Sequence, residues 1–476
     1  MTAQRSTKIV ATLGPASSSP ERLAELVAAG IDVVRLNFSH GTAEDHKKRI
    51  DILRDAAHRA GRTVGVMADL QGPKIRIGKF AAGPVAIKAG QGFILDAACP
   101  LGDATRVGLD YPELIDDVVA GDVLLLDDGR TVFDIEHIEG TEIHCRNRHD
   151  GELSNNKGIN KQGGGLSAPA LTPKDMADIK TAAALNVDYV AVSFPKSGAD
   201  MRQARQLLRD AGSDALVIAK IERVEAVENL EDILHATDGI MVARGDLAVE
   251  VGDAAVPALQ KRMIRLAREH NRFAITATQM MESMITSPVP TRAEVSDVAN
   301  AVLDGTDAVM LSAETASGAY PVQAVEAMVR VCVAAEQSQT VTLDTHFLDQ
   351  VFTRIDQSIS MAALFTAFHL KVKAIATLTE SGSTTLWMSR HDVDIPIYAL
   401  TPSPATSRKL ALYRNVHPLL LPKTDDRDAS LAQAERLLLA HGCVKRGDLI
   451  VLTVGEPMGQ PGGTNTLKIV RVGEHA

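Results

Sequence analysis

Cysteine and aromatic residues are scarce in this chain of 476 residues. Its cysteines are scattered and form no CxxC pair, so neither a disulfide framework nor a zinc site is predicted. They are Cys99, Cys145, Cys332 and Cys443. Aromatic residues make up only 3% of the chain, so its core must be aliphatic. A reducing cytoplasm fits this composition best.

Long apolar runs and an excess of positive charge are also missing. The run that follows Lys8 is too short for a signal peptide, and no other run is long enough to span a bilayer. The chain has 50 lysines and arginines against 60 acidic residues, a net charge of −10. This balance argues against a general affinity for nucleic acid or membranes and favours small-molecule partners.

Short β-branched runs alternate with helix-period segments from Lys8 to Ala313, which is typical of parallel β/α units. Helix starts are predicted where a hydroxyl precedes proline, at Ser19 and Thr172. The predicted strands cover residues 8–13, 32–38, 64–70, 188–194, 216–221, 239–242, 273–278 and 308–312. Eight such units predict a TIM barrel, (β/α)8.

One connection is too long for a barrel loop. From Gly72 to Ser167 strand signals and glycine turns replace the helical period, which predicts a small β-barrel-like domain inserted after the third strand. Such an insert leaves the barrel at the end where catalytic loops lie, and we expect it to close over a site as a lid. The alternative is an inert insertion.

After about Gln339 a third region begins, a C-terminal α/β domain. Its predicted strands cover residues 373–378, 395–400, 417–421, 448–454 and 467–472. The predicted domains are a barrel over 1–71 and 168–340, the insert over 72–167, and the C-terminal α/β domain over 341–476. The loop from Thr379 to Thr385 is rich in Ser, Thr and Gly; either a phosphate nest or an ordinary helix cap explains it.

Charged residues follow two of the predicted barrel strands. Lys220 and Glu222 end one apolar run, and Asp246 follows the next. Since the carboxyl ends of barrel strands meet at one rim, these side chains should lie close together there. A lysine beside two carboxylates indicates metal-assisted phosphoryl chemistry.

Several segments on successive predicted strands together identify a known family. They are Arg35-Leu-Asn-Phe-Ser-His-Gly41, Asp69-Leu-Gln-Gly-Pro-Lys-Ile-Arg76, Lys220-Ile-Glu222, Met241-Val-Ala-Arg-Gly-Asp-Leu247, Ala277-Thr-Gln-Met280 and Pro290-Thr-Arg-Ala-Glu294. In order and spacing, the chain resembles a bacterial-type pyruvate kinase along essentially its whole length. The resemblance implies Mg²⁺-dependent transfer of the phosphoryl group of phosphoenolpyruvate to ADP. The products would be pyruvate and ATP, as in the last step of glycolysis, and the enzyme a cytoplasmic homotetramer.

The resemblance also implies roles for single residues. Glu222 and Asp246 would bind Mg²⁺, or Mn²⁺ in its place. The expected catalytic residues are Lys220, Arg35 and Thr278. Substrate is expected to contact Arg35, Lys220, Gly245, Asp246 and Thr278. The nucleotide, ADP or ATP, is expected to contact Asn37, His40, Arg76 and Lys157.

Two positions depart from the family pattern. A K⁺ ion would be bound by Asn37, Ser39, Asp69 and Leu70, but Lys74 stands where potassium-requiring relatives have glutamate. We therefore expect that K⁺ is not required, because the lysine ammonium supplies the charge.

A phosphorylated allosteric effector, a sugar phosphate or a nucleotide, would bind at Thr379, Ser381, Gly382, Ser383 and Thr384. Many relatives have arginine where this chain has Ser383.

Two other functions fit parts of the same pattern. A barrel lyase or aldolase would also hold Mg²⁺ and a pyruvate-like enolate with two carboxylates, but it would not need Arg76, Lys157 or the insert. A metabolite-sensing relative without catalysis would bind phosphoenolpyruvate but give no turnover. The presence of Lys220, Glu222 and Thr278 favours the enzyme.

Overall fold

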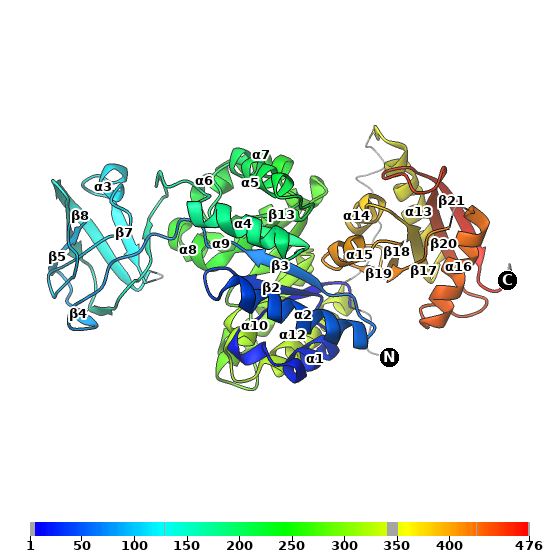
Figure 1. Ribbon diagram of the computed structural model, residues 1–476, viewed down its shortest axis with the longest axis horizontal. Helices are drawn as coiled ribbons and strands as arrows, with labels where there is room; N and C mark the ends of the chain where they lie inside the picture. Colours follow the sequence, from blue (N-terminus) through cyan, green and yellow to red (C-terminus); the bar gives the residue numbers. More distant parts are fainter. Residues whose placement is uncertain (1–4, 128, 340–350, 425, 475–476) are drawn as a thin grey trace.

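Eight parallel strands form a closed barrel at the centre of the computed structural model, which describes residues 5–127, 129–339, 351–424 and 426–474. The strands pair in the order β1-β16-β15-β14-β13-β12-β3-β2 (Figure 1). Their bounds are β1 Lys8–Thr12, β2 Val33–Asn37, β3 Gly65–Asp69, β12 Tyr189–Val192, β13 Leu216–Ile221, β14 Gly239–Ala243, β15 Phe273–Ala277 and β16 Ala308–Leu311. The predicted TIM barrel is confirmed.

Helices surround the barrel, and their caps follow from the sequence. The Ser19 hydroxyl accepts a hydrogen bond from the Arg22 amide, and Thr172 and Asp175 form a reciprocal capping box. The helices are α1 Pro20–Ala29, α2 Ala43–Arg59, α4 Pro173–Ala184, α5 Gly198–Asp210, α6 Val224–Glu228, α7 Leu230–Ala236, α8 Arg244–Val251, α9 Val256–Glu269, α10 Arg292–Leu303, α11 Ala313–Ala316 and α12 Pro321–Ser338. Short 3-10 helices cover Pro15–Ser17, Asp253–Ala255 and Glu282–Ile285. No helix in the described ranges is long and apolar enough to cross a membrane.

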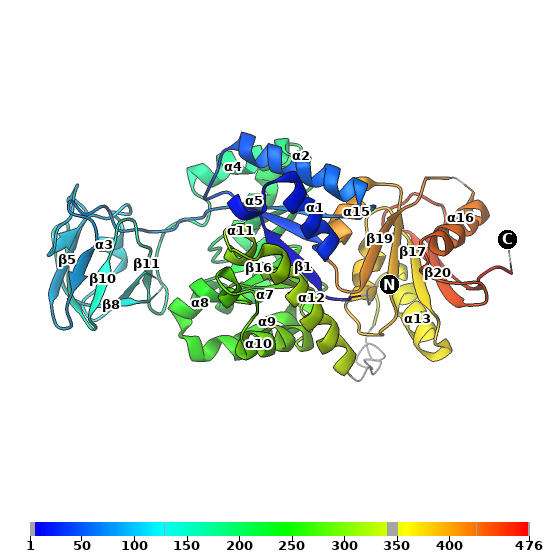
Figure 2. The same cartoon turned by 90° about the horizontal axis from the view of Figure 1, so that it is seen from below.

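The segment between β3 and α4 folds on its own core. It contains one six-stranded and one two-stranded sheet, with the stacked rings of Phe93 and Phe133 inside. Its elements are β4 Val85–Ile87, β5 Gly92–Asp96, β6 Arg106–Val107, α3 Leu114–Asp117, β7 Val123–Leu126, β8 Thr131–Glu139, β9 Glu142–Asn147, β10 Gly151–Leu153 and β11 Ile159–Lys161. Figures 1 and 2 show this insert standing away from the barrel at the end of two connecting segments.

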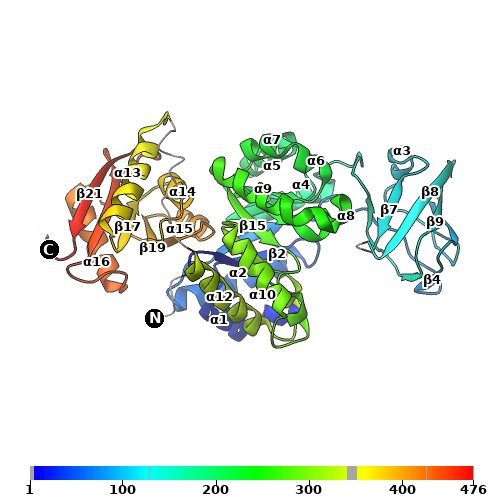
Figure 3. The same cartoon turned by 180° about the vertical axis from the view of Figure 1, so that it is seen from behind.

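The C-terminal region forms a five-stranded sheet in the order β19-β18-β17-β20-β21, parallel except for β21. Its elements are α13 Ile355–Leu370, β17 Ala374–Leu378, α14 Ser383–Ser389, β18 Ile397–Thr401, α15 Pro404–Leu410, β19 Val416–Leu420, α16 Arg427–Ala440, β20 Leu449–Gly455 and β21 Thr464–Arg471. It lies on the opposite side of the barrel from the insert (Figure 3). The α/β fold predicted for this region is confirmed.

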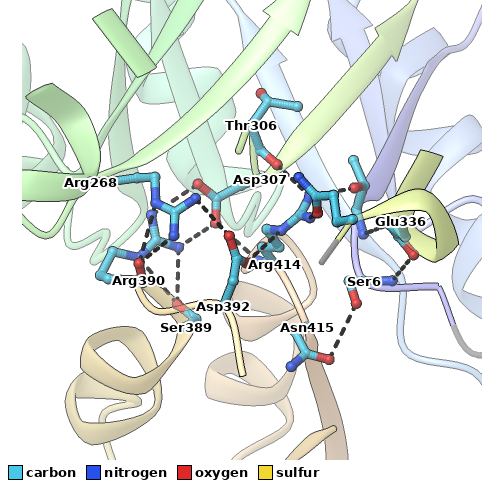
Figure 4. A network of polar contacts seen from close by, with 12 residues as sticks. Ser6, Arg268, Thr306, Asp307, Glu336, Ser389, Arg390, Asp392, Arg414 and Asn415 are labelled. Atoms are coloured by element: carbon cyan, nitrogen blue, oxygen red, sulfur yellow. Dashed lines mark hydrogen bonds and ion pairs between the residues drawn. The ribbon is translucent and has the colours of Figure 1, made fainter. Parts of the chain in front are cut away.

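The C-terminal region covers the amino ends of the barrel strands. Lys8 at the start of β1 donates to the Val416 carbonyl at 2.5 Å, and the Tyr189 hydroxyl donates to the Lys409 carbonyl at 2.7 Å. A buried network around Asp307, at the start of β16, joins the two regions further (Figure 4). The carboxyl ends of the strands therefore open away from this interface, toward the insert.

Candidate active site at the carboxyl ends of the barrel strands

Lys220 lies at the centre of a charged cluster at the carboxyl ends of the strands. Its Nζ is 2.9 Å from Glu222 Oε1 and 3.3 Å from Asp69 Oδ1, and it donates to Ser193 Oγ at 2.7 Å. Burial acts to lower the pKa of Lys220, but Asp69 and Glu222 outweigh it and raise this pKa. The ammonium group therefore stays charged at neutral pH and is held at a fixed position.

Asp69, at the end of β3, joins this lysine to Arg35 on β2. The Arg35 Nε donates to Asp69 Oδ2 at 2.5 Å, and its Nη1 donates to the Thr12 hydroxyl at 3.2 Å. Burial acts to raise the pKa of Asp69, but Lys220 and Arg35 hold it below its usual range. Two cations are thus fixed on one buried carboxylate, an arrangement suited to an anionic ligand.

Glu222 lies immediately after β13, with its side chain 1% exposed. Its Oε2 accepts a hydrogen bond from the Phe194 amide at 2.9 Å. Burial raises the pKa of Glu222 to about 7; Lys220 opposes this shift, and the nearby Asp246 and Asp69 add to it. A cation bound beside Glu222 and Asp246 would reduce the repulsion between these carboxylates. The hard carboxylate oxygens of Glu222 and Asp246 fit Mg²⁺, which prefers such donors.

Thr278 and Gly245 are brought together by the ends of β15 and β14. The Gly245 amide donates to the Thr278 hydroxyl at 2.8 Å. Thr278 has φ +69°, a left-handed conformation that is costly for a β-branched residue. Arg244 holds this backbone, because its Nη2 donates to the Thr278 carbonyl at 2.7 Å. The threonine is therefore kept in a strained position at the rim.

Lys74 crosses from the start of the insert to the barrel. Its Nζ lies 3.8 Å from Asp246 Oδ1, in the first turn of α8, and both side chains are partly exposed. The ammonium group is therefore adjacent to one of the predicted magnesium ligands.

Several oxygens predicted to bind a monovalent cation already have protein partners. The Asn37 Oδ1 accepts from the Ser39 amide at 3.0 Å, and the Leu70 carbonyl accepts from the Ser193 hydroxyl at 2.7 Å. The Asp69 carboxylate contacts Arg35 and Lys220, as described above.

The remaining nucleotide candidates lie on the loop after β2 and on the insert. His40 is exposed in the loop after β2. Arg76 and Lys157 lie on adjoining segments of the insert, where Arg76 donates to the Asn156 carbonyl at 2.9 Å and Lys157 pairs with Asp127 at 2.7 Å. Arg76 pairs with Gly158, the neighbour of Lys157, and both segments adjoin Lys74, whose Nζ lies 3.8 Å from Asp246 Oδ1.

The predicted effector loop lies at the other end of the molecule, between β17 and α14. The Gly382 amide donates to Thr379 Oγ1 at 2.9 Å, and Ser381 Oγ donates to Ser383 Oγ at 3.3 Å. Thr379, Ser383 and Thr384 line a cleft of the C-terminal sheet. Three of the five effector candidates therefore share this cleft, in the region that lies on the opposite side of the barrel from the insert.

Sequence reasoning assigned no role to Ser193 or Arg244. Ser193 directly follows the buried strand β12, the same kind of position that singled out Lys220, and Arg244 lies inside a motif used for the resemblance. The position of Ser193 after a buried strand and that of Arg244 inside a motif were both visible in the sequence. However, serine is common at strand ends, and the sequence does not show which carbonyl an arginine side chain will contact.

Two protein-family models match the chain. The one described as "Pyruvate kinase, barrel domain" matches residues 4–325, and the one described as "Pyruvate kinase, alpha/beta domain" matches residues 357–470. The chain belongs to the pyruvate kinase family. The resemblance and the enzyme class predicted from the sequence are confirmed.

Known pyruvate kinases match over nearly the full length. Pyruvate kinase II of Salmonella typhimurium is 52% identical over 474 residues, covering 98% of this chain and 99% of the relative. Pyruvate kinase of Haemophilus influenzae is 50% identical, covering 95% and 96%. A crystal structure of a pyruvate kinase from Cryptosporidium parvum superposes with a TM-score of 0.92 at 35% identity, covering 99% of this chain and 97% of that one.

Proposed function

We propose that this pyruvate kinase transfers the phosphoryl group of phosphoenolpyruvate to ADP with Mg²⁺ as cofactor, in the last step of glycolysis. The observation that carries the proposal is the joining of Arg35, Asp69, Lys220 and Glu222 in one buried network at the carboxyl ends of the strands. This rim is where barrel enzymes place their chemistry.

Each residue of the network has a physical task in that reaction. The Lys220 ammonium and the Arg35 guanidinium neutralise the phosphoryl oxygens as the group leaves the enolate. Glu222 and Asp246 hold Mg²⁺, or Mn²⁺ in its place, which polarises substrate and phosphoryl oxygens when bound. Phosphoryl transfer to ADP yields ATP and an enolate, whose methylene carbon then takes a proton near the Thr278 hydroxyl.

The amino end of α8, where Gly245 lies, favours the substrate carboxylate through the helix dipole, while the Gly245 amide itself donates to Thr278. The residues proposed to contact the nucleotide phosphates are Asn37, His40, Arg76 and Lys157. The last two belong to the insert, so we propose that it closes over the rim as a lid and excludes water.

The assay that tests the whole proposal is pyruvate formation from phosphoenolpyruvate and ADP. Turnover should require ADP and should stop when EDTA removes the divalent ion.

We expect full turnover without potassium. Lys74 Nζ lies 3.8 Å from Asp246 Oδ1 and supplies positive charge beside the metal ligands, while the oxygens of Asn37 and Leu70 have protein donors. Lys74→Glu should make the rate depend on K⁺, with a loss on the order of tenfold in its absence, equivalent to about 1.4 kcal/mol. Steady-state rates at saturating Mg²⁺, in a tetramethylammonium buffer with and without KCl, measure this effect.

The matched control is Lys79→Glu, which reverses the charge of an exposed lysine of the same segment. It should leave the potassium response unchanged. A wild-type enzyme that is inactive until K⁺ is added would contradict the role given to Lys74.

We expect a phosphorylated effector with a single phosphate to bind the C-terminal cleft. Among its described lining residues Lys423 is the cationic side chain, opposed by Glu380, so the cleft matches one phosphate better than two. Ribose 5-phosphate, glucose 6-phosphate or AMP should lower the half-saturating concentration of phosphoenolpyruvate by about fivefold or more, the usual size of such coupling. Fructose 1,6-bisphosphate should act more weakly.

Lys423→Gln should abolish this response, whereas Lys445→Gln, at an exposed lysine outside the cleft, should preserve it. If none of the four compounds changes the half-saturating concentration of phosphoenolpyruvate, the proposal that this cleft binds an effector is wrong.

We also propose the assembly and domain boundaries expected from the sequence. The enzyme would work in the cytoplasm as a homotetramer, testable by light scattering. The domain limits remain 1–71 with 168–340, 72–167, and 341–476. The closed barrel and the separate sheets of the insert support this division. The limit at residues 340 and 341 lies outside the described residues.

A further inference from the structure

Three potential metal ligands lie together on the β8–β9 hairpin of the insert. His137 and Glu139 are two residues apart on β8, and His144 lies on β9. Residues at this spacing project from the same face of a strand. One ligand atom from each side chain lies within 4.8 Å of the others.

A β-bulge sets up this arrangement. The register of β8 against β9 shifts between Ile135 and His137, after which His137 pairs directly with His144. A bulge re-aims the side chains that follow it. The two imidazole rings are stacked, with centroids 4.2 Å apart and planes 12° apart. Both histidines are thus held side by side across the hairpin.

A fourth group supports the three from the same face. Glu142 pairs with Glu139 across the strands, and its Oε2 lies 3.0 Å from His144 Nε2. Its other oxygen is 2.7 Å from Arg106 Nη1, which fixes the carboxylate. A carboxylate beside a ligating imidazole orients the ring and increases its basicity.

We propose that His137, Glu139 and His144 bind a divalent transition-metal ion, with Zn²⁺ as the best match. Two imidazole nitrogens and one carboxylate oxygen are a typical zinc donor set, and water can complete the shell because the site is exposed. Mg²⁺ prefers oxygen ligands alone, so this site differs in chemistry from Glu222 and Asp246. The bound ion clamps β8 to β9.

The test is a Zn²⁺ titration of the full-length protein by calorimetry, with excess Mg²⁺ present to occupy the barrel site. Wild type should bind one Zn²⁺ ion at the hairpin. His137→Asn and Glu139→Gln should each weaken this binding by at least about tenfold, the lower end of the effect of disturbing a metal site. Both side chains are exposed, so the substitutions leave the fold intact.

The matched control is His149→Asn, which removes an exposed imidazole of the insert outside the cluster. It should bind Zn²⁺ as wild type does. The proposal is overturned if His149→Asn weakens binding as much as His137→Asn, or if wild type and His137→Asn bind equally. Loss of the Zn²⁺ signal in Glu222→Gln alone would also overturn it, by placing the ion in the barrel.

Discussion

Lys220→Ala should reduce kcat by about 100-fold to 1000-fold, the usual cost of removing one preorganised electrostatic group. The Lys220 side chain is only 12% exposed, contacts Asp69 and Glu222, and would meet the phosphoryl oxygens as their charge is redistributed. Because this interaction strengthens in the transition state, kcat should fall far more than KM rises. Pyruvate formation at saturating phosphoenolpyruvate, ADP and Mg²⁺ measures the effect.

Two measurements separate this loss from structural damage. Lys47→Ala removes an exposed lysine whose partner is Asp51 on the same helix, and its kcat should match wild type. Circular dichroism should show the barrel intact in both variants. If the Lys220→Ala enzyme keeps most of its kcat, Lys220 does not stabilise the transition state.

The barrel and its rim were predictable because both depend on local patterns. Most residues of the barrel strands are apolar and buried, and such short runs are visible in one sequence. Lys220 and Glu222 stand two residues apart at the end of one of them, so strand geometry alone puts both side chains on one side. Closure of the barrel then brings these two side chains close to Asp246.

Contacts between distant segments were not predictable. The Ser193 hydroxyl links Lys220 to the Leu70 carbonyl across three strands, and the Lys74 ammonium reaches Asp246 from outside the barrel. Residue types at those positions fit many partners, and only the packed fold selects one. The β-bulge that pairs His137 with His144 is likewise a property of the hairpin register.

Another such contact joins the barrel to the C-terminal region. Arg390, at the end of α14, donates to Asp307 Oδ2 at 2.9 Å, and its second terminal nitrogen pairs with Oδ1 (Figure 4). The two side chains are 3% and 1% exposed. Asp307 also accepts hydrogen bonds from the amides of Ala274 and Arg414, both at 2.9 Å. One carboxylate thus holds two barrel strands and the C-terminal region together.

Arg390→Met should therefore destabilise this interface by about 3–5 kcal/mol, because it leaves the buried Asp307 charge without its partner. The chain has a single tryptophan, Trp387, three residues before Arg390, so its fluorescence reports on the interface directly. The midpoint of its thermal transition should fall well below that of wild type. Arg427→Met, which breaks exposed pairs with Asp428 and Glu456, should lower this midpoint far less, because solvent screens exposed ion pairs. Equal shifts in the two variants would show that the interface does not depend on this buried pair.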